Sequence, residues 1–283
     1  MTLLVFGETG QVATELAALC PSAQFLNRSV ANLCDPGACA AAIHTYAPQA
    51  VINAAAYTAV DQAEDDETAA TTINGVAPGA MAKACASLGI PLVHLSTDYV
   101  FDGTGTAPWR PDDPTAPLGA YGRSKLAGEV AVRGSGATHA ILRTSWVVSD
   151  HGSNFVKTML RLGADRDQLT IVADQIGGPT WARDIAAACL ALAGRLQTDP
   201  STSGTYHFAG GPNTSWADFA RAIFDAAGIA CDVVDIPSSD YPTPAKRPGN
   251  SRLDMAHTTQ TFGIARPDWQ AALPYILKDL TAP

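Results

Sequence analysis

The sequence has little charge and no long run of any one kind of residue. Of its 283 residues, 16% are charged and 47% are hydrophobic, a balance typical of a folded globular chain. The net charge is −9 and no long basic run occurs, which argues against nucleic acid as a partner. No apolar run approaches ~18 residues and no leader pattern opens the chain, so we expect a cytoplasmic protein without membrane contact.

Disulfide and metal-binding patterns are also missing. The six cysteines form no CxxC pair and have no metal-ligand spacing, so we assign no metal-binding residue. Most of them lie in apolar or alanine-rich runs, which predicts small buried hydrophobic side chains in a reducing compartment. They are Cys20, Cys34, Cys39, Cys85, Cys189 and Cys231.

A glycine turn follows the first apolar run, at residues 3–6. The turn carries Gly7, Gly10 and Ala13 and leads into residues with helical spacing. Strand, glycine turn and helix open a dinucleotide-binding unit, because glycines let the backbone approach a pyrophosphate and the helix N-terminus supplies N–H groups. The spacing is GxxGxxA instead of GxGxxG, so an ordinary glycine turn stays open as the alternative.

The second predicted strand, at residues 24–26, bears on cofactor choice. An acidic residue after this strand would bind the ribose 2′-hydroxyl of NAD, whereas an arginine would accept the 2′-phosphate of NADP. Positions 27 and 28 hold no carboxylate, and Arg28 is present. This favours NADPH and leaves NADH open as a second donor; the alternative is a solvated surface arginine.

Two further strands end in residues suited to a ligand. The strand at 50–53 runs into Ala54–Ala56, small residues over which a flat cofactor can lie, although a tightly packed helix start is the alternative. The strand at 90–95 ends in Ser96-Thr97-Asp98, at the edge where open α/β sheets bind ligands. The long, polar loop at 102–118 predicts a lid or a binding loop.

A helix is predicted to begin at Tyr121, and Lys125 lies one turn later on the same face. Together with Thr97 they place a phenol, an ammonium and a hydroxyl at one point. The ammonium favours the phenolate, so we expect the pKa of Tyr121 to lie below its usual value of about 10. Such a group suits carbonyl reduction or the reverse oxidation.

The order of elements predicts an α/β fold, a Rossmann-type doubly wound parallel sheet with a smaller C-terminal substrate-binding domain. We place the NAD(P)-binding domain at 1–150, with elements near 168–208 returning to it, and the mainly substrate-binding domain at 151–283. The basic, proline-rich segment at 241–252 suits a diphosphate, with a solvated loop as the alternative. An alanine-rich helix at 63–88, with an acidic first turn of structural role, should break near Gly75 and Pro78.

These motifs together resemble the dTDP-4-dehydrorhamnose reductases of the extended short-chain dehydrogenase/reductase superfamily. The resemblance covers nearly the whole chain and rests on GETGQVATEL, VINAAAYTAVDQAE, STDYVFDG, APLGAYGRSKLAGE, RTSWV, NFVKTMLRL, DQIGGPT and TPAKRPGNSRL. Ala13 departs from the usual last glycine. Asn27 and Asn32 replace the aspartates of many members, which leaves the preference between NADPH and NADH open.

The resemblance implies reduction of the C4 ketone of dTDP-4-dehydro-β-L-rhamnose to dTDP-L-rhamnose, with hydride from NADPH or NADH. It implies that Thr97 is the catalytic hydroxyl, Tyr121 the proton donor and Lys125 its partner. The residues expected to line the cofactor are Gly7, Gly10, Gln11, Val12, Ala55, Ala56, Tyr57, Tyr121 and Lys125, and we add Arg28, Asn32 and Leu33. Those expected near the nucleotide-sugar are Thr97, Asp98, Tyr99, Trp146, Arg247 and Asn250.

Several alternatives stay open. The same scaffold serves other nucleotide-sugar reductases and epimerases, and also non-catalytic NADP-binding regulatory subunits, such as the β subunit of methionine adenosyltransferase. Some members of the family bind Mg²⁺ at a dimer interface. No complete ligand set transfers to this sequence, so a Mg²⁺ requirement and a homodimer both stay open.

Overall fold

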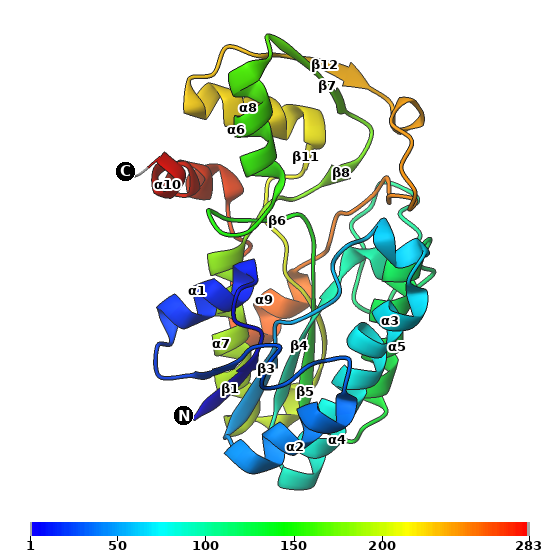
Figure 1. The fold of residues 1–283 in the computed structure, drawn as a ribbon, viewed down its shortest axis with the longest axis vertical. Helices are drawn as coiled ribbons and strands as arrows, with labels where there is room; N and C mark the ends of the chain where they lie inside the picture. The colour runs from blue at the N-terminus through cyan, green and yellow to red at the C-terminus, as the bar shows by residue number, and fades with distance from the viewer. Residues whose placement is uncertain (1, 282–283) are drawn as a thin grey trace.

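A six-stranded parallel sheet forms the centre of the computed structural model, which describes residues 2–281 (Figure 1). The strand order is β10-β5-β4-β3-β1-β2, which confirms the predicted Rossmann-type sheet. The strands are β1 (Leu3–Phe6), β2 (Gln24–Leu26), β3 (Ala50–Asn53), β4 (Leu92–Thr97), β5 (His139–Thr144) and β10 (Gly204–His207).

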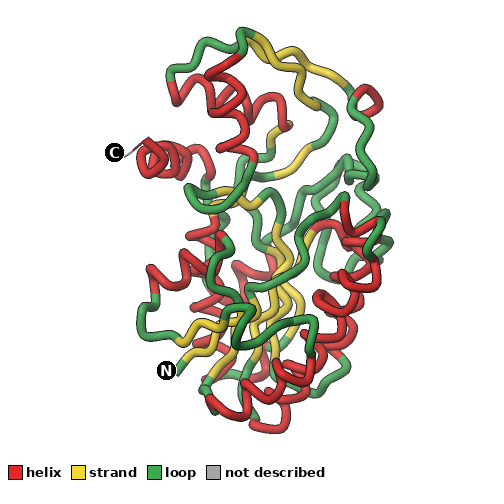
Figure 2. The backbone as a smooth tube through the Cα atoms, in the orientation of Figure 1, coloured by secondary structure: helices red, strands yellow, loops and turns green. Residues whose placement is uncertain are grey.

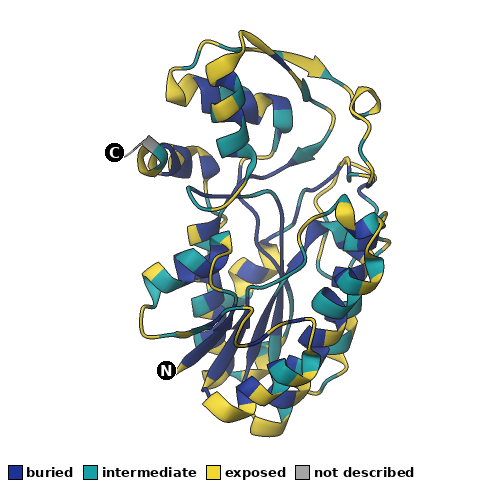
Figure 3. Ribbon diagram, in the orientation of Figure 1, coloured by how far each residue is buried: buried dark blue, intermediate teal, exposed yellow. Residues whose placement is uncertain are grey.

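Helices cover both faces of this sheet. One face packs against α1 (Gln11–Leu19), α7 (Ala182–Thr198) and α9 (Ala256–Phe262), and the other against α2 (Pro36–Tyr46), α4 (Ala77–Leu88) and α5 (Ala120–Arg133). Leu3 and Val5 belong to the first core, while Leu4 and Phe6 belong to the second. Because alternate residues of a strand face opposite sides, burial on both faces requires the continuous apolar runs seen in the sequence. Figure 3 shows the central strands, such as β1 and β3, buried and the outer helix surfaces exposed.

The strand order reverses between β1 and β3, and this switch point brings two turns together. Gly7 has φ +108°, and a Cβ there would lie 3.4 Å from both Ala54 C and Ala55 N. The glycine therefore permits both the backbone conformation and the close approach. In open α/β sheets a ligand binds in the crevice beside this point.

A third apolar core lies among the elements beyond the carboxyl edge of the sheet, whose backbone Figure 2 shows apart from the six strands. It is built from α6 (Phe155–Asp165), α8 (Trp216–Ala227), α10 (Trp269–Thr281) and the parallel pair β7 (Gln168–Val172) and β12 (Asp232–Ile236). Short strand pairs join β6 (Val147–Val148) to β9 (Thr180–Trp181) and β8 (Ile176–Gly177) to β11 (Thr214–Ser215). The division into two domains near residue 150 stays a prediction.

The alanine-rich segment breaks where expected. A 3-10 turn η1 (Gln62–Glu64) precedes α3 (Glu67–Thr71), and the π-helical turn η2 (Thr72–Val76) separates α3 from α4. The other 3-10 turns are η3 (Asp98–Val100), η4 (Pro200–Thr202) and η5 (Ser238–Asp240). None of the helices within residues 2–281 combines the length and apolar character needed to cross a bilayer.

The cysteines follow the expectation only in part. All six are free thiols, and Cys39, Cys85 and Cys189 are buried. Burial raises the pKa of the Cys39 thiol to about 11 and of the Cys85 and Cys189 thiols to about 12, so these behave as inert apolar side chains. Cys34 is exposed, so for this residue the prediction is wrong: it lies in the turn after β2, beyond the sheet.

Candidate active site

A pocket of about 550 Å³ opens at the switch point of the sheet. Its walls come from the turn after β1, the segment after β2 and the segment after β3. Eight residues predicted to line the cofactor lie in it: Gly7, Gly10, Arg28, Asn32, Leu33, Ala55, Ala56 and Tyr57. The structure therefore brings together three sequence segments that were assigned to the cofactor separately.

The side-chain amides of Asn27 and Asn32 accept hydrogen bonds from other residues of the segment after β2 and so hold its conformation. Asn27 Oδ1 accepts hydrogen bonds from Ser29 N at 3.0 Å and from Ser29 Oγ at 2.6 Å, and Asn32 Oδ1 accepts one from Cys34 N at 3.0 Å. Positions 27–34 hold no carboxylate, and Arg28 is exposed on the pocket wall. Arg28 suits a 2′-phosphate, while the carboxylates of the pocket, Glu8 and Asp66, come from the turn after β1 and the start of α3 and not from the segment after β2.

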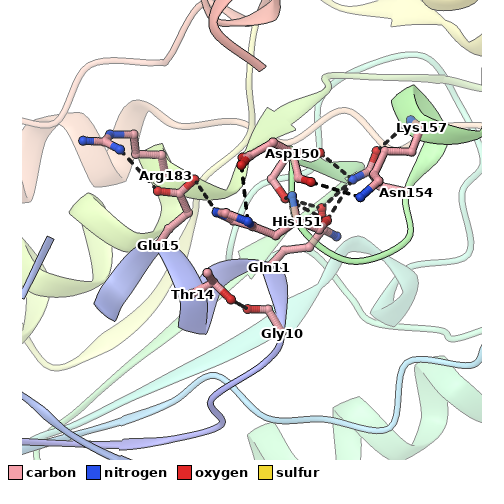
Figure 4. A network of polar contacts seen from close by, with 10 residues as sticks. Gly10, Gln11, Thr14, Glu15, Asp150, His151, Asn154, Lys157 and Arg183 are labelled. Atoms are coloured by element: carbon pink, nitrogen blue, oxygen red, sulfur yellow. Dashed lines mark hydrogen bonds and ion pairs between the residues drawn. The ribbon is translucent and has the colours of Figure 1, made fainter. Parts of the chain in front are cut away.

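The side chains of Gln11 and Val12 do not line this pocket. Gln11 Oε1 accepts hydrogen bonds from Ser149 Oγ at 2.8 Å and Asn154 Nδ2 at 3.0 Å, so it faces the β6–α6 segment (Figure 4). Val12 is 8% exposed and packs in the core beneath the turn. The predicted cofactor contact of these two residues is therefore left to their backbone N–H groups at the N-terminus of α1, and it stays a prediction.

Thr97 and Tyr121 meet at the carboxyl edge of the sheet. Thr97 ends β4, and Tyr121 is the second residue of α5. Burial raises the pKa of the Tyr121 phenol to about 12, opposed by a hydrogen bond with Thr97, while the charge of Asp98 adds to the rise. A hydroxyl and a protonated phenol thus lie side by side.

Lys125 lies one turn further along α5 and is 3% exposed. Its Nζ donates a hydrogen bond to the Leu95 carbonyl oxygen at 2.7 Å. Burial lowers the pKa of Lys125 to about 8, although the charge of Glu129 acts in the opposite direction. The expectation of a lowered Tyr121 pKa is therefore wrong: burial of the phenol dominates, and the ammonium is bonded to Leu95.

Asp98 and Tyr99 flank this group. Asp98 is 2% exposed, and burial raises its pKa to about 6, partly offset by hydrogen bonds from Ser251 and Thr97. The Tyr99 ring meets the Tyr121 ring edge to face, with centroids 5.5 Å apart. Both predicted substrate residues therefore lie beside the phenol.

The other predicted substrate residues have different surroundings. Arg247 forms an ion pair with Asp61 at 2.6 Å. Asn250 uses its amide to hold the 102–118 loop, donating to Thr104 O at 3.2 Å and Ala107 O at 2.8 Å. Trp146 stacks on Trp216, with ring centroids 3.5 Å apart. Asn250 thus has a structural task, and its amide is fully engaged within the protein.

The 102–118 loop is anchored along its length. Trp109 N donates to Arg252 O at 2.9 Å, and Asp254 N donates to Trp109 O at 2.8 Å. The Trp109 ring also stacks on Phe101 at 4.6 Å. A lid role for this loop stays a prediction.

Several buried polar atoms near these residues have no hydrogen-bond partner within residues 2–281. They include Tyr57 Oη, Asp98 Oδ2, Thr144 Oγ1, Ser145 Oγ and Arg247 Nη1. Buried polar atoms are normally satisfied, so unpaired ones in the same region suit a polar ligand. Thr144 and Ser145 are not among the site residues predicted from the sequence. The signal lay in their place directly at the end of β5, where Thr144 pairs in register with Thr97.

A buried ion pair between Arg143 and Glu129 lies next to the site and was also not predicted from the sequence. Arg143 and Glu129 are 2% and 0% exposed, and Arg143 donates to Glu129 through Nε at 2.8 Å and Nη2 at 2.7 Å. Ser96 Oγ donates to the same carboxylate at 2.6 Å. Arg143 Nη1 also donates to Pro111 O at 3.1 Å, so this pair ties β4, β5 and α5 to the 102–118 loop.

Two carboxylates of the acidic run at 64–67 bind residues of α5. Glu64 Oε1 accepts a hydrogen bond from Ala120 N at 2.9 Å, and Glu67 pairs with Arg123 at 2.7 Å. Glu64 therefore satisfies a free N–H at the start of the helix that carries Tyr121.

One group within residues 2–281 places possible metal ligands within 4.8 Å of one another: Glu15, Asp150 and His151 (Figure 4). His151 Nε2 lies 3.6 Å from Glu15 Oε1, and His151 Nδ1 lies 3.3 Å from Asp150 Oδ2. Arg183 pairs with Glu15 at 3.5 Å. Mg²⁺ prefers octahedral oxygen ligands, so a set with an imidazole and cation-paired carboxylates fits an ion-pair network better.

The fold and the site define a class, the Rossmann-type oxidoreductases with a Thr, Tyr and Lys group at the sheet edge. The family model described as RmlD substrate binding domain matches residues 1–282. The dTDP-4-dehydrorhamnose reductase of Burkholderia thailandensis is 46% identical over 295 residues, covering 99% of both chains. That of Escherichia coli K12 is 41% identical over 294 residues, covering 99% of this chain and 98% of its own. The chain belongs to the dTDP-4-dehydrorhamnose reductase family and is an enzyme.

Solved structures agree with this assignment. The dTDP-4-dehydrorhamnose reductase of Bacillus anthracis, solved in complex with NADP, superposes with a TM-score of 0.90 at 31% identity. It covers 98% of this chain and 99% of its own. The corresponding structure from Clostridium acetobutylicum gives a TM-score of 0.93 at 34% identity and full coverage of both chains.

Proposed function

We propose that this enzyme reduces the C4 ketone of dTDP-4-dehydro-β-L-rhamnose to dTDP-L-rhamnose and uses NADPH as the hydride donor. One observation carries the proposal: the Thr97 hydroxyl at the end of β4 and the Tyr121 phenol at the start of α5 lie together at the sheet edge, with Lys125 one turn away on the same helix. The names of its relatives and the NADP bound to the Bacillus anthracis protein support the choice of substrate and cofactor.

The pocket at the switch point suits the dinucleotide. Gly7 and Gly10 leave room for a pyrophosphate, and Ala55 and Ala56 form a flat wall. Arg28 would bind the 2′-phosphate as a charged donor. When bound there, NADPH supplies the hydride for the ketone.

Tyr121 acts as the proton donor. With a pKa of about 12 the phenol stays protonated at neutral pH, so it is ready to donate to the alkoxide that develops at C4. The Thr97 hydroxyl donates to Asp98 Oδ1 at 3.1 Å in this structure, and on binding it would turn this hydrogen bond to the same substrate oxygen. Donors aimed at a developing oxyanion are each worth about 3 kcal/mol. Lys125, which the family resemblance makes the partner of Tyr121, would supply the positive charge that offsets part of the burial cost of the tyrosinate.

The direct test is a steady-state assay with dTDP-4-dehydro-L-rhamnose generated in situ. The loss of reduced nicotinamide absorbance is followed, and the sugar product is identified. Stoichiometric formation of NADP⁺ and dTDP-L-rhamnose is expected. Epimerisation without net NADPH oxidation would contradict the reductase assignment. NADPH binding without turnover, together with co-purification of a larger enzyme, would instead favour a regulatory subunit.

A further inference from the structure

One ion pair joins the cofactor side of the site to the C-terminal segment. Asp61 lies between β3 and η1, whereas Arg247 lies between η5 and α9. Arg247 Nη2 donates to Asp61 Oδ2 at 2.6 Å, and Ala245 N donates to Asp61 Oδ1 at 3.1 Å. Asp61 thus holds both the guanidinium and the backbone two residues before it.

The other end of this guanidinium has no partner. Arg247 Nη1 is buried and makes no hydrogen bond within residues 2–281, although the side chain as a whole is 22% exposed. A guanidinium presents its donors as a rigid fork, and a buried donor without a partner is costly. Because Asp61 fixes Nη2, the direction of Nη1 is fixed as well, and this favours an acceptor from a ligand.

The position of the ion pair between Asp61 and Arg247 indicates which ligand provides the acceptor for Nη1. The charges of Arg247 and Asp61 both act on the Tyr99 phenol, and the Tyr99 ring packs on Tyr121. Neither Asp61 nor Arg247 lines the pocket at the switch point. The free donor therefore lies on the substrate side of the site, where an anionic group of a nucleotide-sugar would be its acceptor.

We propose that Asp61 is a positioning residue, which holds Arg247 through Nη2 so that Nη1 can bind the diphosphate of the nucleotide-sugar. The inference rests on the proposed function for the identity of the sugar. Binding of a diphosphate by Arg247, here called the diphosphate arm, can be measured without turnover. Loss of Asp61 leaves Arg247 charged but free to rotate, so binding weakens although the cation remains.

The experiment compares Asp61→Ala, Arg247→Met and the double variant with wild type. We measure kcat and KM for the nucleotide-sugar, the Kd of dTDP and of thymidine by calorimetry, and the Kd of NADPH. Asp61→Ala should raise the KM of the sugar and the Kd of dTDP about tenfold, a difference of about 1.4 kcal/mol. The Kd of thymidine and of NADPH should not change, and the double variant should bind dTDP no worse than Arg247→Met.

A matched control removes a different ion pair nearby. Glu67→Gln breaks the exposed pair with Arg123 and should leave both dTDP and NADPH binding unchanged. Unchanged dTDP binding in Asp61→Ala, additive losses in the double variant, or equal losses for NADPH and dTDP would overturn the inference. Asp61-dependent dTDP binding without turnover of the sugar would retain the diphosphate arm and refute the proposed function.

Discussion

Lys125 donates a hydrogen bond from its Nζ to the Leu95 carbonyl oxygen, at 2.7 Å and two residues before Thr97. The bond ties the start of α5 to the end of β4, and so sets the distance between the elements that carry the phenol and the hydroxyl. It also keeps the ammonium in a buried place, where its charged form is disfavoured and its pKa falls to about 8.

We expect kcat/KM for the reduction to fall as the pH rises through about 8. Lys125 is charged below this value and neutral above it, whereas the Tyr121 phenol keeps its proton up to about 12. We therefore assign the loss of kcat/KM at alkaline pH (the alkaline limb) to deprotonation of Lys125. A pH profile of kcat/KM with NADPH measures it. The exposed Lys83 on α4 offers the control, since Lys83→Met should retain the limb. A profile that stays flat to about pH 9.5 would contradict this assignment.

The buried pair beneath the site should matter for stability. Glu129→Gln leaves the Arg143 cation buried without its counterion, so we expect the free energy of unfolding to fall by about 3–5 kcal/mol. Urea denaturation measures this loss. The exposed pair of Glu67 and Arg123 is the control, where Glu67→Gln should cost less than about 1 kcal/mol.

The same carboxylate predicts a dependence of stability on pH. Burial alone would raise the pKa of Glu129, but hydrogen bonds and charge from Arg143, with help from Ser96 and Arg133, lower it on balance. A lowered folded-state pKa gives stability at neutral pH that is lost as the pH falls through the acid range. In Glu129→Gln this contribution to the acid loss should disappear. An unchanged slope of stability against acid pH would refute the account.

Gln11 tests the difference between a cofactor contact and a structural one. Gln11→Leu removes the acceptor for Ser149 and Asn154, so we expect a loss of about 1–2 kcal/mol in the free energy of unfolding. Gln11→Glu keeps an oxygen acceptor and should lose less. The Kd of NADPH is measured in parallel. A Gln11→Leu variant with normal stability and weak NADPH binding would restore the sequence-based expectation.

Arg28 should decide between the two reduced nicotinamides. Arg28→Ala removes the charged donor suited to a 2′-phosphate, so the KM of NADPH should rise about tenfold while that of NADH stays unchanged. Steady-state assays with each cofactor give the ratio. Equal losses with both cofactors would show that Arg28 does not distinguish the 2′-phosphate.

Local patterns explain what was predictable from the sequence. The strands β1 and β3 are short apolar runs that pack on both faces, and a run of this kind is visible without knowledge of its neighbours. The glycine turn and the Tyr121-to-Lys125 spacing are equally local. Helix α10 was missed, and it carries Pro274 in its interior, which disturbs the helical pattern.

Long-range contacts explain what was not predictable. Gln11 lies 138 residues from Ser149, and Asp61 lies 186 residues from Arg247, so only the folded chain shows that they bond. The burial of each side chain is the other quantity that cannot be read from the sequence. The Tyr121 pKa was expected to fall because Lys125 is near in sequence, but the desolvation that raises it depends on the whole packed site.

The proposed role of Tyr121 as proton donor is tested by the single-turnover rate of Tyr121→Phe, with the Kd of NADPH measured alongside. The variant keeps the ring that packs on Tyr99 and loses only the hydroxyl that meets Thr97. We predict a rate lower by about 10²–10⁴, with cofactor affinity and thermal stability unchanged. A rate close to that of wild type would contradict the assignment of the proton donor.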